Sequence, residues 1–198
     1  MSKDLSLNIG RHIALKDIVK HYAEFPKHTP IQVFTGSPRT YVRNVETVKK
    51  HIKGAEKLLG EIACYVHASY LTNIVDGPTK SKTLNYLEED LEISDLIGAK
   101  GLVIHVPRIK DLDLEHSIQV MTTGILQLLE YTHKKKLKVK LLLETPSGQG
   151  SEILTNIDDF LNVCNTIKRS KYGDHFGIVI DTCHVFAAGY LPDEYIEY

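Results

Sequence analysis

The chain has 198 residues, 42% of them hydrophobic, and a formal net charge of −1 at pH 7. This composition excludes a disordered polar chain, and without an apolar run of about 18 residues no membrane-spanning helix and no membrane partner are expected. The near-neutral charge excludes a strongly basic chain that binds nucleic acid over its whole surface, but it leaves room for a local field from clustered side chains or bound cations.

Short apolar runs alternate with longer amphipathic stretches along the chain. In chain order the pattern predicts a strand at 5–10, a helix at 15–25, a strand at 31–35, a helix at 45–59, a strand at 62–67, a helix at 82–97, a strand at 101–106, a helix at 114–133, a strand at 139–144, a helix at 157–168 and a strand at 177–181. The strands are almost continuously hydrophobic, as expected for strands that are buried on both faces of a parallel sheet.

Repeated βα units restrict the fold to a doubly wound sheet or a TIM barrel. No GxGxxG turn and no GxxxxGK[ST] loop follows any expected strand, which disfavours the nucleotide-binding doubly wound folds. We therefore predict an α/β chain that forms a single partial domain over residues 1–198. Its fold would be an incomplete TIM (β/α)8 barrel with about six βα units.

The three cysteines indicate the redox environment. Cys64, Cys164 and Cys183 are odd in number, have no regular spacing and form no CxxC motif. Reduced thiols in an intracellular protein are the simplest interpretation. The sequence does not distinguish a cytoplasmic from a nuclear location.

Side chains that can bind metals end four successive predicted strands. They are His67, His105, Glu144 and Asp181, and His184 follows Asp181 by three residues. In a parallel barrel the C-terminal ends of all strands meet at one rim, so these side chains are expected to converge there. A mixture of imidazole and carboxylate ligands suits zinc or manganese.

Each of these residues also has an ordinary structural interpretation. A single histidine at a strand end is more often hydrogen-bonded than metal-bound, Glu144 could pair with a lysine or arginine, and Asp181 could cap the next helix. The joint pattern favours a metal, because burying so many ionisable groups costs much free energy without a cation.

Three segments carry longer motifs. They read HASYLTN at 67–73, LETPSGQGS at 143–151 and DTCHVFAAGY at 181–190. These segments resemble the patterns H-x-S-Y-L-x-N, L-E-N-T-A-G-Q-G-S and D-T-C-H-x-F-A-A-G-Y-D of the endonuclease IV family of zinc-dependent apurinic/apyrimidinic endonucleases. The last two segments are long and specific.

The resemblance implies a ligand set and a reaction. His67, His105 and Glu144 would bind a first zinc ion, Glu144 would bridge to a second that Asp181 also holds, and His184 would bind a third. Glu144 is thus the expected catalytic residue. The implied activity is zinc-dependent hydrolysis of the phosphodiester bond 5′ to an abasic site, which leaves a 3′-hydroxyl and a 5′-deoxyribose phosphate.

The resemblance also implies that double-stranded DNA with abasic sites is the partner. By position, Arg39, Tyr70 and Leu71 would contact the DNA from the loops at the rim. An apolar wedge with an arginine suits insertion into the minor groove and extrusion of a damaged nucleotide. The ordinary alternative for Tyr70 is an aromatic side chain that packs on the rim.

The chain also departs from the family pattern. The family carries further ligands in an H-x-N-D segment, a D-R-H-x-x-x-G segment and a final strand-end glutamate, and none of these segments occurs in the 198 residues. Val106 and Pro107 stand where the family has Pro-Gly, and Thr145 and Pro146 stand where it has Asn-Thr.

These departures lead to the expectation of a C-terminally truncated member with fewer than three zinc ions. Such a chain would have weak or no activity unless a missing C-terminal segment or fragment completes it. Two alternatives stay open: a non-catalytic remnant that binds zinc or DNA, and a single-metal barrel of the sugar isomerase or epimerase type.

Overall fold

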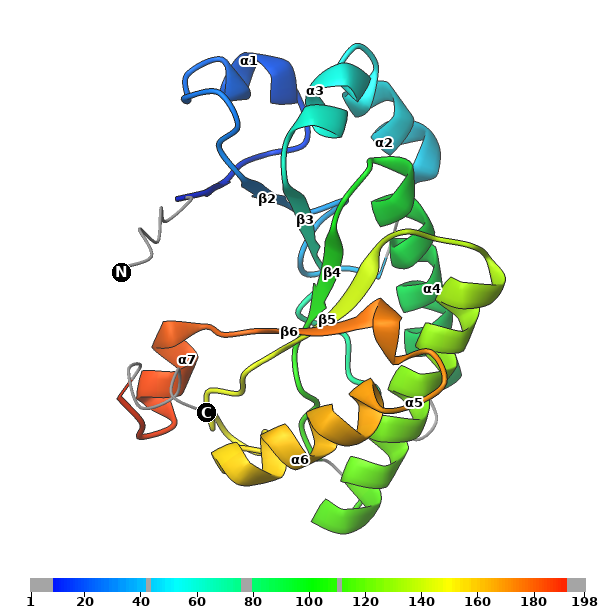
Figure 1. Cartoon of the computed structure of the whole chain (residues 1–198), viewed down its shortest axis with the longest axis vertical. Coiled ribbons are helices and arrows are strands. Elements are labelled where there is room, and N and C mark those ends of the chain that lie inside the picture. Colours follow the sequence, from blue (N-terminus) through cyan, green and yellow to red (C-terminus); the bar gives the residue numbers. More distant parts are fainter. Residues whose placement is uncertain (1–8, 42–43, 76–79, 110–111, 192–198) are drawn as a thin grey trace, which may run out of the picture.

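The computed structural model describes residues 9–41, 44–75, 80–109 and 112–191 (Figure 1). Its centre is a curved sheet of six parallel strands in the order β1-β2-β3-β4-β5-β6, so each strand pairs with its neighbours in the sequence. The strands are β1 (Arg11–His12), β2 (Ile31–Val33), β3 (Cys64–His67), β4 (Gly101–Ile104), β5 (Lys140–Glu144) and β6 (Phe176–Val179). This is the strand order of successive βα units in a TIM barrel, and it confirms the predicted fold class.

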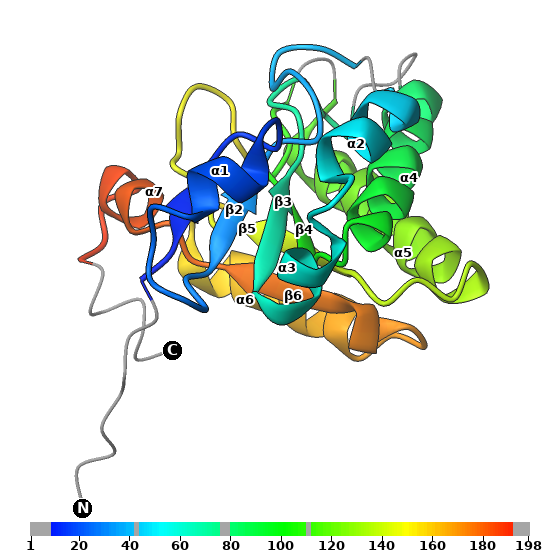
Figure 2. The same cartoon turned by 90° about the horizontal axis from the view of Figure 1, so that it is seen from above.

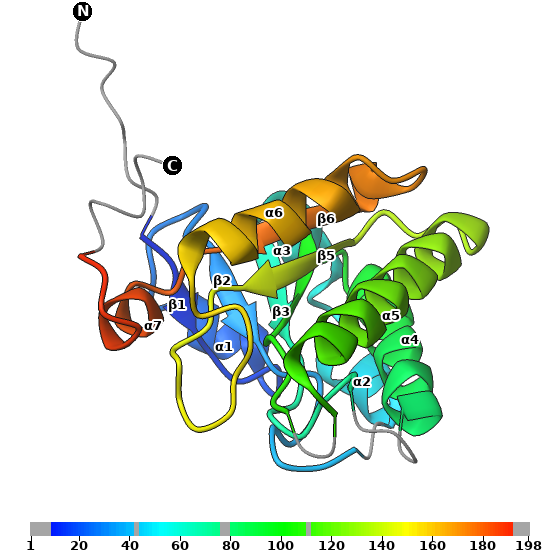
Figure 3. The ribbon, with the colours of Figure 1, turned by 90° about the horizontal axis from the view of Figure 1, so that it is seen from below.

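Helices connect the strands and cover the outer face of the sheet, as the views from above and below show (Figures 2 and 3). They are α1 (Ile18–Tyr22), α2 (Val45–Ile52), α3 (Glu56–Glu61), α4 (Lys80–Leu96), α5 (Leu114–Lys134) and α6 (Ile157–Lys168), with a short 3-10 helix η1 (Gly173–His175). Helix α7 (Thr182–Ala187) follows the last strand, β6, and lies apart from this outer layer (Figure 1). α4 packs on β4 and α6 on β6. In the described part of the chain, no helix has the length and apolar character to cross a membrane.

The main core lies between the sheet and these helices. Val66, Leu102 and Leu141 from the strands and Phe160 from α6 are fully buried in it. Side chains alternate between the two faces of a strand, so the residues between these core positions point to the concave side. There, Tyr65, Val103 and Val179 line a cavity of about 390 Å³. The residues two positions after these, His67, His105 and Asp181, are therefore also expected on the concave side.

The helix expected at 45–59 is in fact two helices, α2 and α3. The break falls at Gly54, whose φ is +84°. A residue in this left-handed region cannot continue a right-handed helix, and glycine adopts it without the steric cost that other residues have. The helical periodicity of the sequence continues across Gly54. The pattern therefore predicted one long helix where the structure has two, and that prediction was wrong.

The first strand also lies later than expected. The prediction placed it at 5–10, of which residues 5–8 lie outside the described residues, whereas β1 covers Arg11 and His12. Its position is set by pairing with β2, since the amide of Arg11 donates to Pro30 O at 2.9 Å and that of Ile13 to Gln32 O at 3.0 Å.

The end of β6 and the start of α7 meet at Asp181. The strand expected at 177–181 ends at Val179, because Asp181 is the N-cap of α7, a helix that the sequence pattern did not predict. Its Oδ1 accepts hydrogen bonds from the amides of Cys183 at 2.7 Å and His184 at 3.0 Å. The cap fixes Asp181 and His184 one turn apart at the rim of the sheet.

Candidate metal centre

His67, His105 and Glu144 come together at the C-terminal ends of β3, β4 and β5. The Nε2 atoms of His67 and His105 lie 3.4 Å and 3.3 Å from Glu144 Oε2, and 3.2 Å from each other. His67 and Glu144 are buried, with 6% of each exposed. These three ligand atoms lie close enough to surround one cation.

Backbone carbonyl groups orient two of the three histidines, His67 and His184. Nδ1 of His67 lies 2.7 Å from Ala68 O, and Nδ1 of His184 lies 2.8 Å from Thr145 O. A carbonyl oxygen only accepts, so we assign the ring proton to Nδ1 in both residues. In the neutral ring, the Nε2 lone pair is then directed to the centre, as in histidines that bind metals.

The buried carboxylate of Glu144 fits a cation. Its Oε2 atom is inaccessible to solvent and has no hydrogen-bond partner among the described residues. Burial lowers the pKa of His105 and outweighs the opposite effect of Glu144, so the neutral imidazole that a metal requires is favoured. A carboxylate oxygen that is buried without a donor is costly, and a bound cation would remove that cost.

A second group consists of Glu144, Asp181 and His184. The two oxygens of Asp181 have different roles: Oδ1 caps α7, whereas Oδ2 lies 3.8 Å from His184 Nε2. Burial alone would raise the pKa of Asp181, but hydrogen bonds from the backbone amides of His184 and Cys183 lower it. Asp181 is therefore both a cap and an available ligand, and Glu144 is common to the two groups.

The three residues expected to contact DNA lie on two adjoining loops. Tyr70 and Leu71 are 57% and 44% exposed, and the Tyr70 ring lies 5.3 Å from that of His67 and 5.7 Å from that of His105. The loop of Arg39 is joined to this loop, because the Tyr70 amide donates to Pro38 O at 2.9 Å. Arg39 itself is exposed. Tyr70 thus lies against the histidines of the candidate metal centre, while most of its surface stays open.

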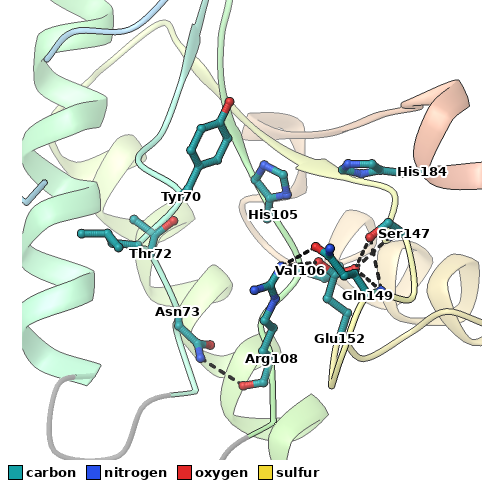
Figure 4. Close-up of a pocket in the computed structure, with 11 residues that line it drawn as sticks. Tyr70, Thr72, Asn73, His105, Val106, Arg108, Ser147, Gln149, Glu152 and His184 are labelled. Carbon is teal, nitrogen blue, oxygen red and sulfur yellow. Dashed lines mark hydrogen bonds and ion pairs between the residues drawn. The ribbon is translucent and has the colours of Figure 1, made fainter. Parts of the chain in front are cut away.

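A cavity of about 460 Å³ opens beside the candidate metal centre (Figure 4). It is lined by Tyr70, Leu71, Thr72, Asn73, His105, Val106, Arg108, Ser147, Gln149, Glu152 and His184. Arg108 and Glu152 did not stand out in the sequence, since each lies several residues beyond a strand end. The glycine-rich segment at 147–151 was the available sequence signal for this wall of the cavity, because glycines allow a loop to turn tightly.

Glu152 holds this loop together. Its Oε2 accepts from the Ser147 amide at 3.0 Å, the Ser147 hydroxyl at 2.8 Å and the Gln149 amide at 3.2 Å, and its Oε1 lies 3.3 Å from Arg108 Nη2. Burial tends to raise the pKa of Glu152, but these hydrogen bonds outweigh burial and lower it. The carboxylate is therefore ionised at neutral pH and organises one wall of the cavity.

Replacing Glu152 with glutamine is expected to destabilise the fold by about 1–3 kcal/mol at pH 7, because Ser147, Gln149 and Arg108 lose a charged acceptor whose side chain is buried. The folded-state pKa lies below the ordinary value of 4.5, so the contribution is complete above that pH and is lost as the pH falls through the folded pKa. Urea unfolding of both proteins at a series of pH values measures this difference. A difference that grows on acidification would contradict the assignment.

The fold and the site together define a class of protein. Parallel βα units with histidine and carboxylate side chains at the C-terminal strand ends are those of a TIM-barrel protein whose active site lies on this rim. The chain belongs to the xylose isomerase-like TIM barrel family, whose model matches residues 27–197.

Curated relatives narrow the resemblance. The chain is 28% identical over 200 residues to “Probable endonuclease 4” of Mycoplasmopsis agalactiae, which covers 97% of this chain and 69% of the relative. It is 26% identical to “Putative endonuclease 4” of Acanthamoeba polyphaga mimivirus, which covers 95% of this chain and 63% of the relative. The resemblance to endonuclease IV is thus confirmed, and the chain spans about two thirds of the length of these relatives.

Solved structures agree on the fold. Endonuclease IV from Thermus thermophilus superposes with a TM-score of 0.73 at 21% identity, covering 93% of this chain and 66% of that one. A D-tagatose 3-epimerase-like protein gives 0.72 at 15% identity, covering 96% and 70%. At these identities the structures establish only the shared barrel architecture. The chemistry has to be inferred from the residues of the site.

Proposed function

We propose that this chain carries the metal-binding and DNA-binding rim of an intracellular DNA-repair endonuclease. The enzyme would hydrolyse the phosphodiester bond 5′ to an abasic site in double-stranded DNA, leaving a 3′-hydroxyl and a 5′-deoxyribose phosphate. The observation that carries the proposal is the pair of ligand groups that share Glu144, beside a loop that exposes Tyr70 and Leu71.

The proposed cofactor is zinc. His67, His105 and Glu144 would hold one ion, and Glu144, Asp181 and His184 would contribute to further ions, with fewer than three expected in this chain alone. Bound zinc would polarise the phosphate and acidify a water molecule. Glu144 contributes a negative charge common to both groups, and the carbonyl groups of Ala68 and Thr145 keep the imidazoles oriented.

The rim residues would select the damaged site. Tyr70 and Leu71 present apolar surface next to the metal centre, and the exposed Arg39 lies on the adjoining loop. Side chains of this kind can insert between base steps from the minor groove and bend the duplex. A duplex that lacks one base is easier to unstack at that position, which would favour binding there.

The proposal is tested with a labelled duplex that contains one tetrahydrofuran abasic analogue. The purified chain with zinc is expected to nick the strand 5′ to the analogue and to leave the intact duplex uncut. A chelator should stop cleavage and added zinc should restore it. We expect slow cleavage, because the two candidate ligand groups among the described residues supply five side chains, too few to complete three tetrahedral zinc sites.

Two results would overturn the proposal. One is the absence of both zinc-dependent cleavage and preferential binding of the abasic duplex over the intact duplex. The other is metal-dependent epimerisation of a ketose sugar without any cleavage of DNA, which would favour the single-metal epimerase alternative. Preferential binding of the abasic duplex without cleavage would reduce the proposal to the DNA-binding remnant.

A further inference from the structure

The loops that follow β4 and β5 are joined at one wall of the cavity. Arg108 and Glu152 form an antiparallel bridge, the Ile109 amide donates to Ser151 O at 2.9 Å, and the Ser151 hydroxyl donates to Ile109 O at 2.7 Å. The Asn73 side-chain amide donates to Arg108 O at 3.0 Å from the loop after β3. The backbone of Arg108 is therefore fixed by contacts from two neighbouring loops.

The side chain of Arg108 lies on the cavity wall, where it reaches toward Gln149 and Glu152 (Figure 4). Its Nη2 atom lies 3.2 Å from Gln149 Oε1 and 3.3 Å from Glu152 Oε1. The Arg108 side chain is 55% exposed, whereas that of Glu152 is 5% exposed. The carboxylate thus supports the guanidinium from the protein side and leaves the other side open to the cavity.

The guanidinium has further capacity to bind an anion. Both contacts use Nη2 alone, at distances longer than the roughly 2.7–2.9 Å of strong charge-assisted bonds. A guanidinium carries five N–H donors in a fork that matches two oxygens of a phosphate. Among the described residues, Nη1 and Nε of Arg108 donate no hydrogen bond.

We propose that Arg108 is a phosphate-binding residue that holds the DNA backbone beside the metal centre. This inference rests on the proposed function and extends it, because it assigns one backbone phosphate of the substrate strand to the cavity wall next to His105 and His184. Glu152 acts as a positioning residue that keeps the guanidinium in place. A sequence-independent contact of this kind strengthens binding of intact and abasic duplexes alike.

The test is equilibrium binding of a fluorescein-labelled intact duplex to the metal-free protein in the presence of chelator, over a series of salt concentrations. Arg108→Gln is expected to weaken binding at low salt by about tenfold. It should also reduce the slope of log affinity against log salt by about one phosphate contact. A purely structural residue would shift the melting temperature and leave this slope unchanged.

Arg169→Gln is the matched control. Arg169 is exposed at the C-cap of α6, at the end of the barrel opposite the cavity, and its variant should bind within about twofold of the unmodified chain. Arg108→Lys keeps the charge but not the fork, so it should retain the salt slope and lose part of the affinity. Far-ultraviolet circular dichroism shows whether each variant is folded.

The outcomes separate this inference from the proposed function. Equal affinity and equal salt slope in Arg108→Gln and Arg169→Gln would overturn the inference, even if the unmodified chain cuts abasic DNA. An unmodified chain that binds no duplex at low salt would overturn it as well. Loss of affinity in Arg108→Gln without any cleavage of abasic DNA would support the phosphate site and count against the endonuclease.

Discussion

Replacing Glu144 with glutamine is expected to lower the zinc affinity of the chain by on the order of 100-fold or more. Glu144 supplies the carboxylate that the two ligand groups share, and its Oε2 is buried between the Nε2 atoms of His67 and His105. The amide of glutamine has nearly the same shape but no charge, so the expected loss comes from the missing negative ligand. Competition with a chromophoric chelator measures the affinity directly.

Glu46→Gln provides the control for this measurement. Glu46 lies exposed on α2, where it pairs with Lys49 at 2.9 Å, and it belongs to neither candidate ligand group. Its variant should bind zinc as the unmodified chain does, since an exposed pair on a helix contributes little. Equal zinc affinity in Glu144→Gln and Glu46→Gln would show that the shared carboxylate does not hold the metal.

Replacing Phe160 with alanine is expected to reduce the free energy of unfolding by about 3–5 kcal/mol. Phe160 is completely buried on the inner face of α6, between this helix and the sheet. Truncation removes its apolar contacts and leaves a cavity that a close-packed core fills only in part. Urea unfolding followed by circular dichroism gives the difference, provided that both proteins unfold in one transition.

Phe186→Ala is the control, because it removes the same type of side chain from an exposed position. Phe186 lies on α7 and is 67% exposed, so Phe186→Ala should change the free energy of unfolding by no more than about 0.5 kcal/mol. A loss below about 1 kcal/mol in Phe160→Ala would mean that α6 does not form part of the core as described.

Most of the barrel follows from local pattern. The expected strands at 31–35, 62–67, 101–106 and 139–144 all contain observed strands, and the helices at 114–133 and 157–168 match α5 and α6 closely. These segments have long, regular apolar periodicity, and their caps, Asp113 and Asn156, accept hydrogen bonds from the first turn. Where a single period persists over many residues, local and tertiary preferences agree.

Two of the errors share one cause, which is that a single residue interrupts a pattern that otherwise continues, and the third comes from strand pairing. Gly54 divides one expected helix into α2 and α3 through a left-handed backbone. Asp181 ends β6 early, because its side chain caps α7. β1 lies at Arg11 and His12 because of its hydrogen bonds to the chain around β2. The hydrophobic pattern of a short stretch of sequence carries no information on these interactions.

The sequence by itself determined the type of barrel and the identity of the candidate ligands, because alternating side chains and a common direction of the strands bring strand-end residues to one rim. The tertiary structure decided what those residues share. It placed Glu144 in both ligand groups, directed Nε2 of His67 and His184 to the centre, and brought Arg108 against Glu152. These features depend on distances between loops far apart in the chain, and such distances exist only once the barrel has formed.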